Sequence, residues 1–182
     1  MTHLSTSRIL KASSLSGMAE IRCFDYVNHP YARVRDALRE DAEALFREAT
    51  KAASTRAESV ASELRVNLGA LEVSADIKIS VLEVAEQASE ASSPPSTRLR
   101  LEWEAARSPR LFPFMSAVLS VYPLTATETQ LDFTGEYEPP LGALGSAVNK
   151  LVGHRLAEAS VHRFLKDVAE HLRATLSRTS ST

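Results

Sequence analysis

Two histidines and a glutamate in the C-terminal third of the chain are spaced so that their side chains could act together. His154, Glu158 and His162 follow one another at steps of four residues. On a helix with about 100° per residue, each step of four drifts by about 40°, so His162 lies about 80° from His154. Two of these side chains can converge on one ion, but the third points too far away to join them without strain in the side chains. No second cluster of histidines or cysteines accompanies them. The sequence therefore predicts no metal site and no cofactor.

His154 is the first candidate for a functional side chain because of the helix that carries it. A helical pattern continues to about Arg178, and its second half has one apolar stripe, formed by Val161, Leu165, Val168 and Leu172. Traced towards the N-terminus, this stripe passes through His154 and otherwise meets small or polar residues, namely Ala157, Lys150, Ala147 and Ala143. Small side chains opposite a sheet leave volume unfilled, so we expect a cavity beside His154 and a dry contact along the second half.

Three roles are open to His154. It can be held by a backbone carbonyl or turn to solvent, it can form a hydrogen bond with a ligand, or it can act as a general acid or base. Glu158 is the local carboxylate that could orient it. Catalysis also needs a group that stabilises developing charge, and no convincing acid–base pair is evident. The sequence therefore assigns no catalytic residue and favours a binding protein over an enzyme.

The elements that must face this helix are strands with alternating side chains. Residues 129–137 alternate apolar and polar, and residues 99–105 alternate apolar and charged. Trp103 and Tyr137 fall on the inner faces, where they are either ordinary core aromatics or part of a pocket lining. The predicted ligand-binding residues lie on this inner face and on the facing helix: Leu101, Trp103, Leu131, Phe133, Tyr137 and His154.

The remaining pattern predicts an α+β fold. A strand over 18–27 precedes Pro30 and two short helical segments, which contain Val34 and Leu38 and then Leu45, Phe46 and Ala49. Alternation predicts strands over 64–68 and 71–81, with Glu83 either continuing the inner face or, as we favour, solvated. Residues 114–124 are apolar on both faces, as expected of a strand that is covered more fully or lies next to a contact. We expect a curved antiparallel sheet of about five or six strands wrapped around one long C-terminal helix.

Several motifs resemble those of the START-like (SRPBCC) superfamily, whose members have the helix-grip fold. They are Arg100-Leu101-Glu102-Trp103, Leu111-Phe112-Pro113, Tyr122-Pro123-Leu124, Gly135-Glu136-Tyr137-Glu138-Pro139-Pro140-Leu141-Gly142 and His154-Arg155, and they are similar to those of uncharacterised bacterial, especially actinobacterial, members. Members of this superfamily variously bind lipids, sterols, polyketides or plant hormones, cyclise polyketides, or serve as co-chaperone modules. The resemblance implies the fold and leaves the function open.

Composition excludes several classes of protein. With 21 Lys and Arg against 23 Asp and Glu, the formal net charge of −2 gives no basic surplus for binding nucleic acid. The single cysteine, Cys23, cannot form an internal disulfide, and no apolar run is long enough to span a membrane, so we expect a cytoplasmic protein. Residues 1–17 lack the alternating pattern and are expected to be a disordered extension of a single domain over 18–178. The oligomeric state is left open.

Three functions fit these observations. The first is binding of a hydrophobic small molecule, lipid-like or polyaromatic, in a cavity between the sheet and the C-terminal helix, without catalysis. The second is an enzyme of the polyketide cyclase/dehydratase type, with His154 and Tyr137 transferring protons. The third is a protein-interaction module whose core is filled by side chains. A view of the interior between sheet and helix would separate the third from the other two.

Overall fold

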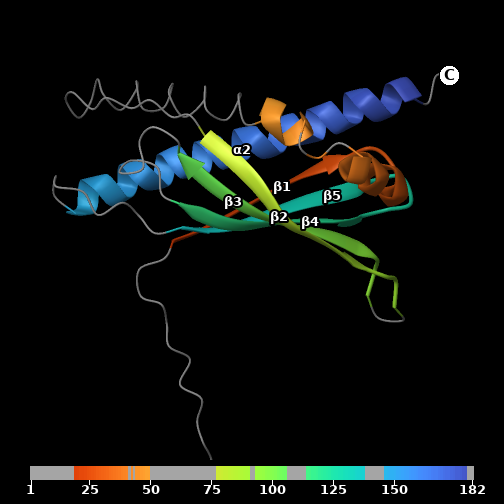
Figure 1. Cartoon of the computed structure of the whole chain (residues 1–182), viewed down its shortest axis with the longest axis horizontal. Coiled ribbons are helices and arrows are strands. Elements are labelled where there is room, and N and C mark those ends of the chain that lie inside the picture. The colour runs from red at the N-terminus through yellow and green to blue at the C-terminus, as the bar shows by residue number, and fades with distance from the viewer. Residues whose placement is uncertain are drawn as a thin grey trace, which may run out of the picture.

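The computed structural model describes residues 19–40, 42, 44–49, 77–90, 93–105, 114–137 and 146–179. Within these ranges the chain forms a sheet and a long helix (Figure 1). In chain order the elements are β1 (Ala19–Val27), β2 (Ile77–Gln87), β3 (Ser96–Ala105), β4 (Met115–Pro123), β5 (Thr129–Tyr137) and α2 (Ser146–Thr179). Residues 31–40 and 44–49, between β1 and β2, are also helical. The predicted α+β class, with short helices after the first strand, is confirmed.

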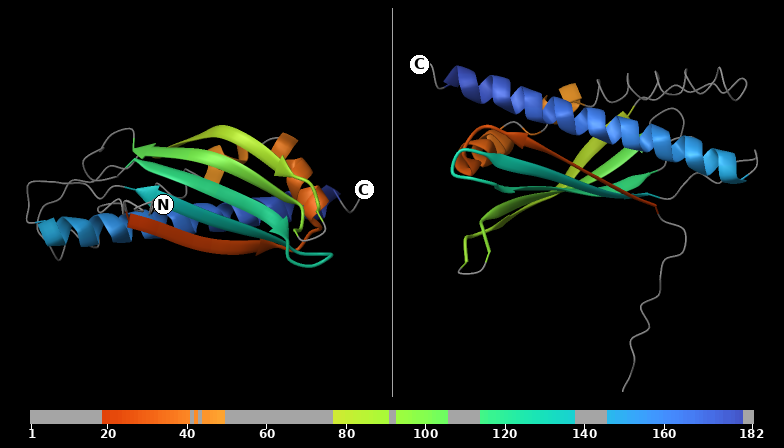
Figure 2. Two further views of the ribbon diagram at one scale, coloured as in Figure 1. Left: turned by 90° about the horizontal axis from the view of Figure 1, so that it is seen from below. Right: turned by 180° about the vertical axis from the view of Figure 1, so that it is seen from behind.

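The sheet is antiparallel throughout the part of the chain that the structure describes. Its strand order is β1-β5-β4-β3-β2, so the first strand pairs with the last and lies at one edge. Consecutive strands from β2 to β5 are neighbours, as short connections favour. Figure 2 shows β1 along one border of the curved sheet, with α2 crossing the concave face. The sheet is thus curved, and the helix covers its concave face.

Alternation decides which side chains face α2. On β5 the apolar residues are buried, and on α2 the predicted stripe of Val161, Leu165, Val168 and Leu172 is buried in the same hydrophobic core. Burying each such side chain stabilises the fold by about 1.5–3 kcal/mol. The strong alternation of β5 therefore predicted its orientation correctly, and the second half of α2 is anchored as expected.

Polar contacts fix the C-terminal half of α2 to the segment around β1. Arg173 Nη2 lies 2.6 Å from Asp25 Oδ1 and also donates to the carbonyl of Tyr26. Arg33, in the helical residues after β1, donates from Nη2 to the Leu176 carbonyl at 3.0 Å. These contacts join residues far apart in the sequence. They determine where the helix crosses the sheet edge.

Two strands differ from the sequence prediction. β2 continues to Gln87, and its register with β3 shifts between Val81 and Glu83, so Glu83 is exposed and pairs with Arg100 at 3.1 Å. The favoured solvated position of Glu83 is therefore confirmed, although the strand does not end before it. The expectation that residues 114–124 form a more fully covered strand is wrong, because β4 is fully buried only at every second position and Ser116 is exposed. The alternative, that this strand lies next to a contact, stays a prediction.

Some predicted features lie outside the described residues. They are the extension over 1–17, the strand over 64–68, most of the strand over 71–81, and the turn over 108–113. No helix in the described ranges combines the length and the apolar character that crossing a membrane requires.

Candidate functional site

The predicted lining residues stand in rows across the concave face. Tyr137 lies opposite Met115, which lies opposite Trp103. Because residues two apart on a strand are about 6.7 Å apart, each further row lies that much farther along the sheet. The following rows are Gly135–Ala117–Leu101, then Phe133–Leu119–Leu99, then Leu131–Val121–Thr97. All five predicted strand residues are buried.

Tyr137 and His154 form the polar contact of this face. The Tyr137 Oη lies 2.7 Å from His154 Nδ1, and the two rings are nearly parallel, with centroids 6.3 Å apart and planes inclined by 18°. Tyr137 is 1% exposed, whereas His154 is half-buried. β5 places the tyrosine by alternation, and the N-terminal half of α2 places the histidine above it. The structure thus joins two of the six predicted residues directly.

This pair always keeps one further hydrogen-bond donor. If the Tyr137 hydroxyl donates to Nδ1, neutral His154 carries its proton on Nε2 and can donate from there. If Nδ1–H donates to the phenol oxygen, the phenol proton is free for another acceptor and Nε2 becomes an acceptor. The pair can therefore exchange a donor between two positions without gaining or losing charge.

Burial keeps the phenol of Tyr137 protonated. The pKa of Tyr137 is raised, first by removal of the side chain from water and second by the negative charge of Glu158, which is exposed on α2. A phenol held neutral donates a hydrogen bond at ordinary pH and is a poor base. The Tyr137 side chain therefore enters its contact with His154 as a neutral phenol.

Phe164 of α2 is the central residue that the sequence analysis missed. Its ring lies edge-on to Trp103, with centroids 5.3 Å apart, and contacts Phe133 at 6.2 Å and Phe46 at 5.6 Å. The signal was present, since Phe164 follows Val161 by three residues and precedes Val168 by four. Aromatic side chains therefore fill the space between sheet and helix at this level.

The aromatic cluster of Phe46, Trp103, Phe133 and Phe164 divides the predicted site residues. Tyr137 and His154 lie on one side of it, towards the N-terminal half of α2. Leu131 stands one row beyond Phe133, away from Tyr137. Leu101 is packed in the row between Trp103 and Phe133 and is fully buried. Any pocket that uses the polar pair therefore belongs to the Tyr137–His154 end of the concave face.

The helical spacing of His154, Glu158 and His162 does not produce a cluster. His154 faces Tyr137, whereas His162 is exposed and lines a groove beside β1. Among the described residues, no group of three His, Cys, Asp or Glu side chains is arranged to hold a metal ion.

The fold can be assigned from the order of the elements. A first strand, short helices, antiparallel strands in the order β1-β5-β4-β3-β2, and one long helix over the concave face are the arrangement that the motifs implied. The chain has the helix-grip fold. The finer resemblance of this helix-grip chain to uncharacterised actinobacterial members stays a prediction.

Several solved structures are similar to this helix-grip chain. The Zhui aromatase/cyclase from Streptomyces sp. R1128 has 15% identity and a TM-score of 0.45, over 87% of this chain and 96% of that one. Ara h 8.0201 has 9% identity and a TM-score of 0.44, over 87% and 99%. Truncated norcoclaurine synthase from Thalictrum flavum has 8% identity and a TM-score of 0.39, over 85% and 93%. No protein-family model matches the chain, and no curated protein matches it.

Proposed function

We propose that this protein binds a hydrophobic small molecule, lipid-like or polyaromatic, between the concave face of the sheet and the N-terminal half of α2, and releases it unchanged. The observation that carries the proposal is the 2.7 Å contact between Tyr137 Oη and His154 Nδ1. It places one spare hydrogen-bond donor at the border of an apolar core, which is the usual composition of a ligand pocket.

The surroundings of the pair support an apolar ligand. Trp103 and Met115 lie in the same row as Tyr137, and both are buried. The aromatic cluster forms the far wall, because Phe164 fills the space beyond Trp103. A flat or unbranched apolar body would rest on this wall, with its polar end towards His154.

The polar end of the ligand is expected to be a neutral acceptor. The raised pKa of Tyr137 keeps the phenol protonated, so the pair offers a donor to a carbonyl or hydroxyl oxygen.

We place the protein in the cytoplasm, because its single cysteine, Cys23, is a buried free thiol that suits a reducing compartment.

Native mass spectrometry of the protein purified from its own host, followed by extraction of the bound molecule, tests this function. We expect the protein to carry an additional mass from a bound molecule. In His154→Gln, the fraction of protein that carries this mass should be lower. His171→Gln is the matched control, because His171 is an exposed histidine on the same helix. Protein that carries no small molecule, and that takes up neither a long-chain alcohol nor a polycyclic aromatic ketone when these are added, would contradict the proposal.

A second candidate is a cyclase/dehydratase-like enzyme acting on a poly-β-keto substrate. The same short contact favours it, because a tyrosine and a histidine 2.7 Å apart can pass a proton between a substrate oxygen and carbon. In this case His154 is the proton acceptor and Tyr137 the donor. Turnover of such a substrate, lost in His154→Gln while binding persists, would favour the enzyme over the binding protein.

A third candidate is a protein-interaction module without a ligand. The observation in its favour is the packing of Phe164 against Trp103 and Phe133, which fills the middle of the concave face. This candidate predicts that no added mass is found. It also predicts that Tyr137→Phe changes the stability of the protein and has no effect on the binding of a small molecule.

A further inference from the structure

A groove runs beside the outer edge of β1, on the side where α2 crosses the sheet. It has a volume of about 640 Å³. Phe24 and Asp25 form its strand wall, and the polar residues of its helix wall are His162, Arg163, Lys166 and Arg173. It is separate from the Tyr137–His154 pair, which lies at the opposite end of β5 from Asp25. The groove is therefore a feature separate from the candidate ligand site.

The strand that supplies this wall, β1, has main-chain groups without a partner in the described part of the chain. The Tyr26 carbonyl accepts from Arg173, and the Tyr26 N–H donates to Asp25 Oδ1 at 2.7 Å, so the main chain of Tyr26 points away from β5. Strand geometry repeats every two residues, so the main-chain groups of Phe24, Arg22 and Glu20 point the same way. No described residue pairs with them, and Figure 2 shows β1 as the outermost strand.

At its C-terminal end, the unpaired edge of β1 is blocked by side chains. Arg173 and Asp25 occupy the hydrogen-bonding positions of Tyr26, which stops further pairing towards Val27. Glu20, Arg22 and Phe24 remain, whose outward N–H and C=O groups have no partner among the described residues. That length suits the addition of one short strand, and an unprotected edge is a known template for such pairing.

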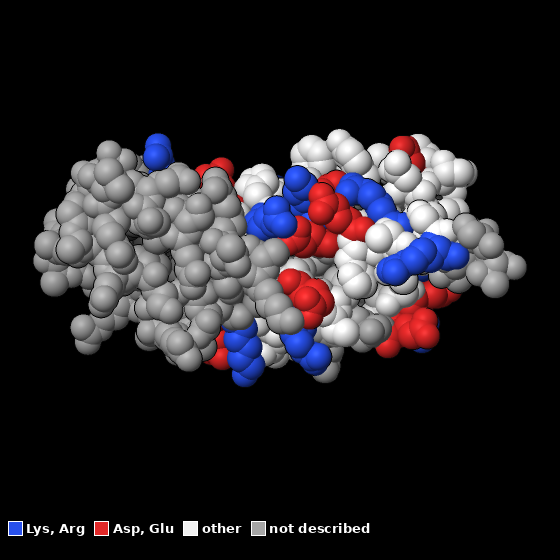
Figure 3. All heavy atoms as spheres, turned by 90° about the horizontal axis from the view of Figure 1, so that it is seen from above, with Lys and Arg blue, Asp and Glu red and all other residues white. Residues whose placement is uncertain are grey.

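The side chains beside the edge indicate what kind of strand fits. Phe24 is 63% exposed and stacks obliquely on Tyr26, with ring centroids 6.2 Å apart. On the helix wall, Arg163 and Lys166 are ion-paired with Asp167 and Glu170, but these two acids do not line the groove. The described groove lining thus holds three cations, and its one acid, Asp25, is already paired with Arg173. Figure 3 shows basic and acidic side chains interspersed over the outer face of the molecule on the side of α2.

We propose that the edge of β1 is a docking site for an extended, acidic segment of a partner protein, which adds to the sheet as a further strand. Its main chain pairs with Glu20, Arg22 and Phe24. Its acidic side chains, on every second residue, face Arg163 and Lys166, and its apolar side chains lie beside the ring of Phe24. A second copy of this chain fits less well, because it would bring its own cationic helix wall into the same groove.

A labelled synthetic peptide in which glutamates alternate with valines tests the site by fluorescence anisotropy. We expect saturable binding to the full chain. The same peptide with alternate main-chain nitrogens methylated should bind more than about tenfold more weakly, because it loses several main-chain hydrogen bonds. A lysine–valine peptide should also bind more weakly. If the glutamate–valine peptide does not bind, or if methylation leaves its affinity unchanged, the proposal is wrong.

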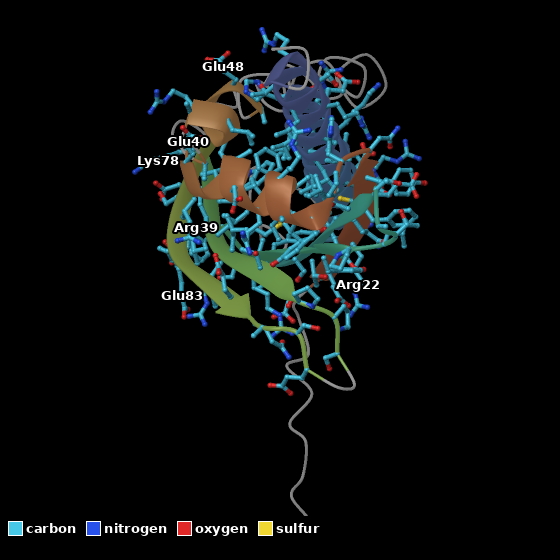
Figure 4. The ribbon with its side chains drawn as sticks, turned by 90° about the vertical axis from the view of Figure 1, so that its right-hand side faces the viewer. Arg22, Arg39, Glu40, Glu48, Lys78 and Glu83 are labelled. Atoms are coloured by element: carbon cyan, nitrogen blue, oxygen red, sulfur yellow. The ribbon has the colours of Figure 1, made fainter. Side chains whose placement is uncertain are left out.

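Two charge reversals test the helix wall of the groove, one in the groove and one as its control. Lys166→Glu should weaken binding of the glutamate–valine peptide about five- to tenfold, through loss of charge complementarity. Lys78→Glu makes the same charge change on β2, at the opposite side of the sheet from Arg22 in Figure 4, and should leave the affinity unchanged. Equal effects of the two reversals would contradict docking in the groove.

Phe24→Pro removes a main-chain donor from the free edge alone, since the N–H of Phe24 faces away from β5. It should weaken binding of the glutamate–valine peptide more than Phe24→Ala does, because the alanine variant keeps its main-chain N–H. Thermal unfolding shows whether each variant is folded, and the methylated peptide decides the matter on the unmodified protein. A dimer that Phe24→Pro dissociates, with no peptide binding, would assign the edge to a second copy and overturn the proposal.

Discussion

The ring of Phe164 on α2 meets Trp103 on β3 edge to face, with planes inclined by 76°. The same ring contacts Phe133 on β5 and Phe46 in the helical residues 44–49. One side chain therefore joins the long helix, two strands and a short helix. Its position separates the part of the concave face around Leu131 from the part near Tyr137 and His154.

Phe164→Ala should lower the free energy of unfolding by about 3–5 kcal/mol, because it removes a buried ring and leaves a cavity. Phe164→Leu should cost less, since it keeps much of the volume. The measurement is urea unfolding followed by the fluorescence of Trp103, the single tryptophan. Glu170→Ala, an exposed change on the same helix, is the control. A loss below about 1 kcal/mol for Phe164→Ala would show that the ring is not central to the core.

His154→Gln separates a binding role from a catalytic one. If His154 orients a ligand, affinity should fall by about 1–2 kcal/mol, the order of one hydrogen bond. If it transfers a proton, turnover should fall by a factor of about 10²–10⁴ with little change in binding, because an amide cannot take up a proton near neutral pH. Affinity and turnover are measured side by side on this variant. If neither changes, His154 is a structural residue.

Stability should fall at alkaline pH because of Cys23. Burial, followed by the charges of Asp132 and Asp25, raises the pKa of the Cys23 thiol from 9.0 to about 12. The unfolded chain loses this proton first, so the stability is fully present below pH 9 and is lost as the pH rises towards 12. The shift corresponds to a loss of about 4 kcal/mol at most. Unfolding free energies from pH 8 to 11 should decline less in Cys23→Ala, and an equal slope would contradict this cause.

The two halves of α2 should exchange amide hydrogens at different rates. The second half is anchored by the stripe of Val161, Leu165, Val168 and Leu172, whereas in the sequence the first half has small and polar residues at the same positions. Local opening should therefore be more frequent in the first half, beside His154. Hydrogen exchange with mass spectrometry measures both halves in one experiment. Equal protection would argue against entry of a ligand at that end.

Gly135→Ala should disturb the row of Tyr137. A Cβ atom at Gly135 would lie 2.5 Å from the Met115 sulfur and 3.1 Å from Cε1 of Phe133. The flexible thioether can move, so we expect a loss of roughly 1 kcal/mol and not unfolding. Adding Met115→Val should recover part of the loss, because it removes the sulfur. Thermal unfolding of both variants checks this, and no recovery in the double variant would contradict the contact.

Local alternation was enough to predict the faces of β3 and β5. Each has apolar side chains at every second position, and a shift by one residue would have exposed all of them. The bulge in β2 was not predictable in this way, because Val81 and Glu83 have the parity of one continuous strand. Nothing in the local pattern marks the position at which the pairing with β3 shifts.

The site needed information that lies outside local patterns. Tyr137 and His154 were both singled out, each from its own element, but their contact depends on how α2 crosses the sheet. Phe164 was overlooked because the stripe was centred on Val161 and Leu165, and the buried face is wider than that stripe. The open edge of β1 follows from strand order, which a single strand pattern does not contain.

The contact between Asp25 and Arg173 joins residues 148 positions apart. As the chain emerges from the ribosome, β1 cannot pair within the described sheet until β5 has been synthesised. The concave face is covered later still, when α2 has been synthesised. Contacts of such long range slow folding and leave apolar surface open to other molecules during synthesis. If the proposed binding function holds, a hydrophobic ligand present at that moment would be enclosed when α2 docks, without having to pass between the docked helix and the sheet.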